Sequence, residues 1–309
     1  MSTRNLSTLG TVGLCGLLAL TGAALPAQRA QRPNTARATA GATTAAIPGK
    51  TAPTYEVYMV RFAGFHGFPV AELVRGADTT RRTDLAFMVG VMKGNNGRTV
   101  LLDAGFYREQ FLAAWKPFDW QTPSSAIARI GLKPEDVTDV IISHVHWDHL
   151  DGADLFPAAR IWIQQAEYDH YVGPDGVPLD EAIDTVDARM LARLHQAGRV
   201  QLIDGDGREI IPGITVYTGG RHTYASEYVG VRTAAGVVVL ASDNMYMFEN
   251  LAKHAPIGAT YTPGDSTSNL NAQDRMRHIA SSPRLIIPGH DPQIFVRFPT
   301  PGNGVAKIE

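Results

Sequence analysis

The segment 143–152, SHVHWDHLDG, constrains the fold of this chain more than any other stretch. It places three histidines and two aspartates within eight residues. The run before it, residues 139–142, is largely apolar and β-branched, which is typical of a buried strand. We therefore expect the polar cluster where a strand ends and the chain turns. Imidazole together with carboxylate favours Zn, Mn or Fe over Ca, which prefers oxygen ligands alone.

The spacing within the segment indicates two metal ions rather than one. On an extended backbone, residues i and i+2 point the same way, so His144 and His146 can bind one ion. Asp148 and His149 are adjacent, and a turn of the chain is needed to bring both to a second ion. Two ions need more ligands than this segment supplies.

Three polar residues downstream repeat the same placement. His222 follows a short apolar strand pattern and a Gly-Gly-Arg sequence. Asp243 follows residues 237–241, VVVLA, and His290 follows residues 285–289, LIIPG. Each stands where an apolar strand ends, as a metal ligand anchored by a sheet would.

The ordered set resembles that of the metallo-β-lactamase-fold hydrolases, over about residues 55–298. Their signature is His-x-His-x-Asp-His, a later His, a later Asp at a strand end and a last Gly-His. The resemblance implies an α/β fold, a four-layer αβ/βα sandwich. It also implies two ions, most simply Zn²⁺, with Mn, Fe or Co as possible replacements. By resemblance, the first ion is held by His144, His146 and His222, the second by Asp148, His149 and His290, with Asp243 bridging.

The segment after the bridging aspartate resembles the N-acyl homoserine lactonases, whose Tyr stands where Tyr246 stands here. The resemblance implies that Tyr246 donates a hydrogen bond to the developing oxyanion. Asp148 is then the natural group to carry a proton to the leaving alkoxide. We expect a dinuclear hydrolase (EC 3.1.1 type) that opens N-acyl homoserine lactones, a quorum-quenching activity, by attack of a metal-bridging hydroxide. Asp243 argues against a true β-lactamase, where this residue is generally absent.

Two alternatives stay open from the sequence. The same site can act on phosphoesters, thioesters or β-lactams, because one activated hydroxide serves all of these bonds. A binding or scaffold protein with a degenerate site is the second alternative, although the ligand set is intact.

Asp103, at another strand end, either orients a ligand imidazole or only shapes a turn.

The first part of the chain predicts export. Residues 9–25 are apolar and uncharged after a single early arginine, which indicates a signal peptide over residues 1–27. An uncleaved anchor is the alternative. Residues 28–53, rich in Ala, Thr, Arg and Pro, predict a flexible linker, and residues 54–309 the hydrolase domain. We expect a periplasmic or secreted protein with no stable membrane association after cleavage. Cys15 is the only cysteine, so the mature chain would have no thiolate ligand.

Composition and pattern complete the prediction. A net charge of −2 gives no reason to expect nucleic acid as a partner, and a small-molecule substrate is expected instead. Two facing sheets with helices outside are predicted, because strands far outnumber helices. The strands expected are 55–62, 84–92, 99–103, 139–142, 159–163, 199–203, 209–211, 215–217, 228–233, 237–241 and 284–287. The helices expected are 107–116, 124–130, 180–197 and 270–281.

Overall fold

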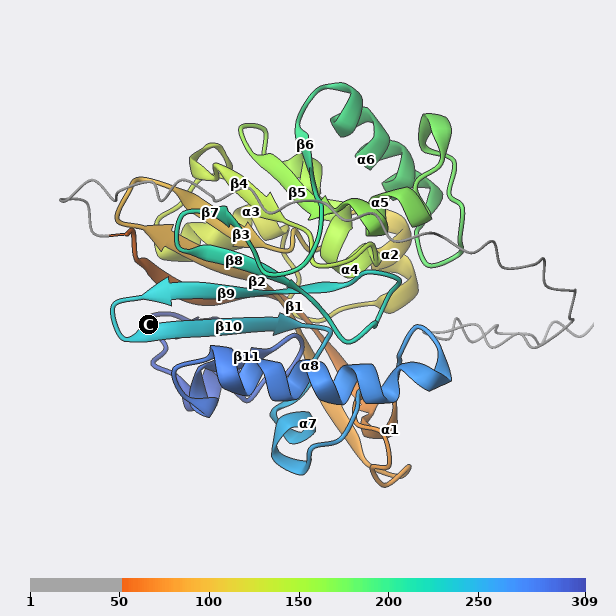
Figure 1. Ribbon diagram of the computed structural model, residues 1–309, viewed down its shortest axis with the longest axis vertical. Helices are drawn as coiled ribbons and strands as arrows, with labels where there is room; N and C mark the ends of the chain where they lie inside the picture. Colours follow the sequence, from red (N-terminus) through yellow and green to blue (C-terminus); the bar gives the residue numbers. More distant parts are fainter. Residues whose placement is uncertain (1–51) are drawn as a thin grey trace, which may run out of the picture. The chain divides into compact units, whose positions relative to one another are not determined.

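The computed structural model describes residues 52–309. The predicted signal peptide and nearly all of the predicted linker lie outside these residues. Among residues 52–309, no helix has the length and apolar character needed to cross a bilayer. The fold of the described part is built on two β-sheets (Figure 1).

The first sheet has seven strands in the order β12-β1-β2-β3-β4-β5-β6. β1 and β2 form a long antiparallel pair, whereas β3 to β6 run parallel to one another. The strands are β1 (Tyr55–Pro69), β2 (Arg82–Gly94), β3 (Thr99–Leu102), β4 (Asp139–Ile141), β5 (Arg160–Gln164), β6 (Val200–Ile203) and β12 (Val305–Lys307).

The second sheet has five strands in the order β11-β10-β9-β8-β7. β8 to β10 alternate in direction and β11 lies parallel to β10, so β8, β10 and β11 all point the same way. The strands are β7 (Arg208–Ile211), β8 (Ile214–Thr218), β9 (Glu227–Thr233), β10 (Gly236–Ser242) and β11 (Ile286–Pro288).

Helices lie on the outer side of each sheet, as α6 and α8 illustrate (Figure 1). The helices are α1 (Val70–Leu73), α2 (Glu109–Trp115), α3 (Pro123–Ala126), α4 (Trp147–Leu150), α5 (Gln165–Tyr171), α6 (Thr185–Gln196), α7 (Phe248–Lys253), α8 (Ser266–Ile279) and α9 (Ile294–Arg297).

Alternate strand residues enter different cores, which produces the layers. In β3, Val100 and Leu102 pack between the two sheets, whereas Leu101 packs against the helices that cover the first sheet. In β10, Leu240 faces the space between the sheets and Val239 packs with α8. Successive side chains of a strand point to opposite faces, so each sheet is apolar on both sides. The predicted sandwich of two sheets with helices outside is confirmed.

Some predicted boundaries were wrong. The strand predicted over 55–62 does not end at Gly64, because β1 continues to Pro69 through two register shifts against β2. The helix predicted over 180–197 begins only at Thr185, where the Asp184 side chain accepts a hydrogen bond from the Val186 N–H. The strand predicted over 284–287 begins at Ile286, after a 3₁₀ turn. The short helices α1, α4, α5, α7 and α9 and the strand β12 were not predicted.

Candidate metal centre

Four strand ends from the two sheets carry the predicted ligands. The segment with His144, His146, Asp148 and His149 follows β4 of the first sheet. His222, Asp243 and His290 follow β8, β10 and β11 of the second sheet. Since those three strands run in the same direction, their carboxyl ends lie at one edge of the sheet. The topology therefore explains why residues far apart in sequence meet.

The first group consists of His144, His146, His222 and Asp243, whose potential ligand atoms all lie within 4.8 Å of one another. His146 Nδ1 lies 3.0 Å from His144 Nε2 and 2.9 Å from His222 Nε2. Asp243 Oδ2 lies 3.3 Å from His222 Nε2. Three imidazole nitrogens thus converge on one carboxylate oxygen.

The second group consists of Asp148, His149 and His290, again within 4.8 Å. Asp148 Oδ2 lies 3.4 Å from His149 Nε2 and 3.6 Å from His290 Nε2. The other oxygen of Asp243, Oδ1, lies 2.9 Å from His290 Nε2 and 3.4 Å from His149 Nε2. Asp243 therefore presents one oxygen to each group. The structure brings together all seven residues that were predicted as ligands.

The contacts inside the cluster fit cations better than hydrogen bonds. His149 Nε2 and Asp243 Oδ1 are both buried and have no hydrogen-bond partner among the described residues, despite their close neighbours. A buried polar atom without a partner costs about 1–3 kcal/mol. Converging nitrogen lone pairs repel one another, and a shared cation removes both penalties. The donor set thus suits one metal ion in each group.

The outward nitrogens of the ligand histidines are held by other groups. The Nδ1–H of His222 donates to the Ala259 carbonyl at 2.8 Å, and that of His290 donates to the Ala86 carbonyl at 3.2 Å. His144 Nδ1 lies 2.9 Å from Ser143 Oγ. With Nδ1 engaged, Nε2 of each ring is left to face the cluster, which is how proteins orient imidazole ligands.

Asp103 fills both of the roles considered for it. One carboxylate oxygen lies 2.8 Å from His149 Nδ1, and the other accepts a hydrogen bond from the Ser143 N–H at 2.8 Å. Its backbone φ is 63°, so it also turns the chain at the end of β3. Asp103 thus orients His149 and ties it to the strand that precedes the ligand segment.

The charges of the cluster are set by burial and by neighbours. Burial lowers the pKa of His144 well below its usual value, and neighbouring histidines add to this effect. Burial likewise lowers the pKa of His146 to about 3. Both rings are therefore neutral at pH 7, the form that binds metal.

For Asp243 and His149, neighbouring charges outweigh burial. Burial would raise the pKa of Asp243, but His290 and His149 outweigh it and hold the pKa well below its usual value. Burial lowers the pKa of His149, yet Asp243 and Asp148 raise it overall. The two ionised carboxylates thus draw positive charge into the cluster, whether from protons or from metal ions.

Tyr246 lies beside the cluster. Its side chain is 2% exposed, and its hydroxyl is 3.4 Å from His222 Nδ1. Its ring centre is 5.6 Å from that of His222 and 5.8 Å from that of His290. The hydroxyl is therefore adjacent to a residue of the first group, and the ring lies near one histidine of each group.

Glu167, on α5, was missed by the sequence analysis. Its buried carboxylate accepts hydrogen bonds from the Val145 N–H at 3.2 Å, the Thr223 hydroxyl at 2.6 Å and the Ala225 N–H at 2.6 Å. Burial raises its pKa to about 7, and these donors oppose the rise. Glu167 thus joins the loop of His144 and His146 to the loop of His222. A single glutamate after a strand gives no sequence signal for such a role.

The chain is similar to a known protein family and to proteins named N-acyl homoserine lactonases. A family model described as the metallo-beta-lactamase superfamily matches residues 85–290. An N-acyl homoserine lactonase of Bacillus cereus is 29% identical over 168 residues, which are 53% of this chain and 60% of that protein. N-acyl homoserine lactonase AttM of Azorhizobium caulinodans is 24% identical over 56% of this chain and 65% of that protein. The chain thus spans about 60% of the length of these curated relatives.

Solved structures show the same fold. A quorum-quenching N-acyl homoserine lactone lactonase superposes with a TM-score of 0.64 at 20% identity, covering 79% of this chain and 94% of that one. AidC, a dizinc quorum-quenching lactonase, superposes with a TM-score of 0.58 at 13% identity, covering 84% and 92%. Since the family model spans more than half of the chain and includes all seven cluster residues, this chain belongs to the metallo-β-lactamase superfamily.

Proposed function

We propose that this chain is a dinuclear metal-dependent hydrolase that opens lactone rings, with N-acyl homoserine lactones as its substrates. The observation that carries the proposal is the seven-residue cluster, in which the two oxygens of Asp243 face two separate ligand groups. The similarity to proteins named N-acyl homoserine lactonases supports the substrate class. Tyr246, buried beside His222, supports it further.

The proposed metal ligands follow the two groups. The first ion would be held by His144, His146 and His222, the second by Asp148, His149 and His290, and Asp243 would bridge them. Zinc suits neutral imidazoles with carboxylates, although Mn, Fe and Co accept the same donors. Two bound divalent ions would lower the pKa of a water molecule and offset the negative charge that develops on a carbonyl oxygen.

Asp148 is proposed as the group that moves the proton. Its side chain is 14% exposed, against 4% for Asp243, so it is the more open of the two cluster carboxylates. It can accept a proton from the attacking water. When the ester C–O bond of the ring breaks, it returns that proton to the leaving alkoxide oxygen. Water adds to the carbonyl carbon, and the products are one carboxylic acid and one alcohol within the same molecule.

Tyr246 is proposed to stabilise the transition state. Its hydroxyl lies next to the imidazole of His222. As the carbonyl carbon becomes tetrahedral, negative charge builds on its oxygen, and a fixed O–H donor stabilises that charge more than it stabilises the substrate.

The direct test uses proton release, since each ring opening yields one acid. Metal-replete protein is mixed with N-hexanoyl homoserine lactone in weakly buffered indicator solution. We expect turnover that a chelator abolishes and added Zn²⁺ restores. Asp243→Asn, which keeps the size of the side chain but removes its charge, should abolish turnover. Absence of chelator-sensitive turnover on any acyl homoserine lactone removes the substrate assignment.

A parallel panel separates the alternatives. Paraoxon, a glutathione thioester and nitrocefin test phosphoester, thioester and β-lactam hydrolysis by the same centre. Metal analysis of the purified protein tests the non-enzymatic alternative, because well under two ions per chain contradicts a dinuclear enzyme.

We also propose that the protein is exported, on the evidence of the sequence of residues 1–27 alone. Fractionation of the producing cell and N-terminal sequencing of the mature chain test this proposal. Full-length protein in the cytoplasmic fraction contradicts it.

A further inference from the structure

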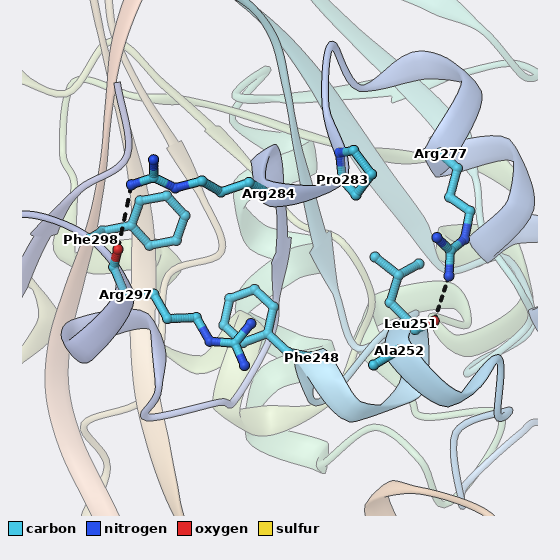
Figure 2. Close-up of a pocket in the computed structure, with 8 residues that line it drawn as sticks. All are labelled: Phe248, Leu251, Ala252, Arg277, Pro283, Arg284, Arg297 and Phe298. Carbon is cyan, nitrogen blue, oxygen red and sulfur yellow. Dashed lines mark hydrogen bonds between the residues drawn. The ribbon is translucent and has the colours of Figure 1, made fainter.

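A cavity lies apart from the cluster, between α7, the C-terminal end of α8, the 3₁₀ turn at Pro283 and α9 (Figure 2). Its volume is about 290 Å³. None of the seven cluster residues lines it. Leu251, Ala252, Pro283 and the rings of Phe248 and Phe298 give it apolar walls.

Three arginines border this cavity and no acidic residue does. They are Arg277, Arg284 and Arg297. Among residues 52–309, no carboxylate lies within ion-pair distance of these guanidinium groups, whereas Arg81 and Arg275 elsewhere are each paired with an acid. Three positive charges therefore border the cavity, and none of them is paired with a carboxylate of residues 52–309.

Asp291 is an acid whose charge interacts with that of Arg297, but both of its oxygens are engaged elsewhere. Its two oxygens accept hydrogen bonds from the backbone N–H groups of Phe248 at 2.9 Å and Gln293 at 2.8 Å. Among residues 52–309, it forms no ion pair with the arginines that line the cavity.

The guanidinium groups are held by aromatic faces. The Cζ atom of Arg297 lies 3.9 Å from the ring centre of Phe248, and that of Arg284 lies 5.2 Å from the ring centre of Phe298. Figure 2 shows the two pairs side by side, with Arg277 across the cavity and bonded to the Leu251 carbonyl. One nitrogen of Arg284 donates a hydrogen bond to the Arg297 carbonyl at 3.5 Å. A guanidinium stacked on a ring keeps its remaining N–H groups available for an anion.

From this arrangement we infer that the cavity binds an organic anion, a carboxylate on a short aliphatic chain. The carboxylate pairs with the guanidinium groups of Arg284 and Arg297, and the chain lies against Phe248, Leu251 and Pro283. Arginine recognises carboxylates through two parallel hydrogen bonds, and apolar walls next to that charge favour an amphiphilic molecule over an inorganic ion.

The test is calorimetric titration of the metal-replete full chain with octanoate. Octanamide has the same chain without the charge, acetate has the charge without the chain, and inorganic phosphate tests anion binding alone. We expect octanoate to bind at least about tenfold more tightly than any of the three. Octanamide lacks the charge-assisted hydrogen bonds, and acetate and phosphate lack the apolar chain. Equal binding of octanamide or of phosphate overturns the inference.

Variants locate the binding. Arg297→Gln and Arg284→Gln should each weaken octanoate binding about tenfold. Ala252→Trp should block it by filling the cavity while keeping all three charges. Arg193→Gln, at an exposed position on α6, is the matched control and should bind like the parent. Circular dichroism and thermal unfolding check that each variant folds.

A carboxylate can also bind the metal centre, and the same variants separate the two sites. Octanoate binding that Arg297→Gln and Ala252→Trp leave unchanged lies elsewhere and contradicts the inference.

Discussion

At the scale of single residues, Glu167 and Asp103 hold the cluster residues in position without belonging to the cluster. Glu167 accepts three hydrogen bonds from two ligand-bearing loops, and Asp103 joins His149 to the segment before the ligands. Such supporting groups fix the direction of metal-binding side chains. Their removal should therefore change metal affinity before it changes the fold.

Glu167→Ala leaves the Val145 N–H, the Ala225 N–H and the Thr223 hydroxyl buried without an acceptor. Each such group costs about 1–3 kcal/mol. We expect metal affinity at the first group to fall at least about tenfold, as outer-shell changes commonly cause. Competition with a chromogenic chelator measures this loss. Glu167→Gln, which retains one acceptor oxygen, should lose less, and equal affinity of both variants and the parent contradicts the bracing role.

Tyr246→Phe removes one hydroxyl next to His222. If that hydroxyl stabilises the oxyanion, kcat on a homoserine lactone should fall about 10²-fold with little change in KM or metal content. Steady-state kinetics measure the split. Tyr228→Phe is the control, because the Tyr228 hydroxyl is buried and has no hydrogen-bond partner among the described residues. An equal loss of rate in both variants would assign Tyr246 a structural role only.

The sequence predicted the cluster residues and suggested Asp103 as a support, but it did not predict Glu167, and the reason is physical. His222, Asp243 and His290 each follow an apolar run, so strand ends identify them. Glu167 lies on a seven-residue helix that follows β5, where an acidic residue normally faces water. Its burial depends on loops 22 and 56 residues away, which no local pattern reveals.

At the scale of elements, the junction between the ligand segment and the end of β3 is tight. Gly152 donates its N–H to the Gly105 carbonyl at 2.8 Å, and a Cβ atom on Gly152 would lie 2.3 Å from the Ala104 carbonyl oxygen. The 3₁₀ turn Asp151–Leu155 that contains it therefore packs directly on the backbone after Asp103.

Gly152→Ala should push these two backbone segments apart. Overpacking of this kind costs about 1–3 kcal/mol, so we expect a lower Tm and weaker metal binding at the second group. Thermal unfolding and metal titration measure the two effects. Gly302→Ala, where nothing lies within 4 Å of the added Cβ, is the control and should change neither.

Helix α6 contacts the same junction through Asp187, a buried acid. Burial and then the neighbouring Asp151 carboxylate raise the pKa of Asp187 to about 9. Arg108 pairs with Asp151 and lies 3.5 Å from Asp187. The folded chain thus keeps a proton on Asp187 that the unfolded chain releases near pH 4.

This shift gives a pH dependence with a definite sign. The contribution of Asp187 to stability is complete below about pH 4 and is lost progressively as the pH rises toward 9. Asp187→Asn cannot ionise, so its stability relative to the parent should increase between pH 5 and pH 9. Denaturant unfolding at several pH values measures the difference, and a constant difference contradicts the assigned pKa shift.

Element boundaries were harder to predict than element types. β1 passes through Gly64, which pairs with Ala86 of β2, and the register shifts on either side of it bend the strand without ending it. The helical pattern predicted from residue 180 gives way to Asp184, whose side chain caps α6. Bulges and caps depend on a partner strand or on one local hydrogen bond, and periodicity does not contain either.

At the scale of the whole molecule, the proposed ions would join the two sheets, because β4 belongs to one and β8, β10 and β11 to the other. A ligand present at about 1,000 times its Kd stabilises the folded state by about 4 kcal/mol. For a domain of this size, that corresponds to roughly 10 °C in Tm. We expect dialysis against a chelator to lower Tm by about this amount, and Zn²⁺ to restore it. An unchanged Tm contradicts metal binding across the sheets.

The sandwich itself was predictable, because hairpins, apolar strands and few helices leave few ways to bury so many apolar faces. The parallel pairing of β10 with β11 has a consequence for how the protein matures. These neighbours are separated by α7 and α8, so β11 pairs only after that crossover has been formed. A nascent chain that has closed the β9–β10 hairpin already contains His144, His146, His222 and Asp243, the four residues of the first group, but it still lacks His290 of the second group. The first group should therefore be able to bind its cation before the second group is complete, because the second group needs β11 in place.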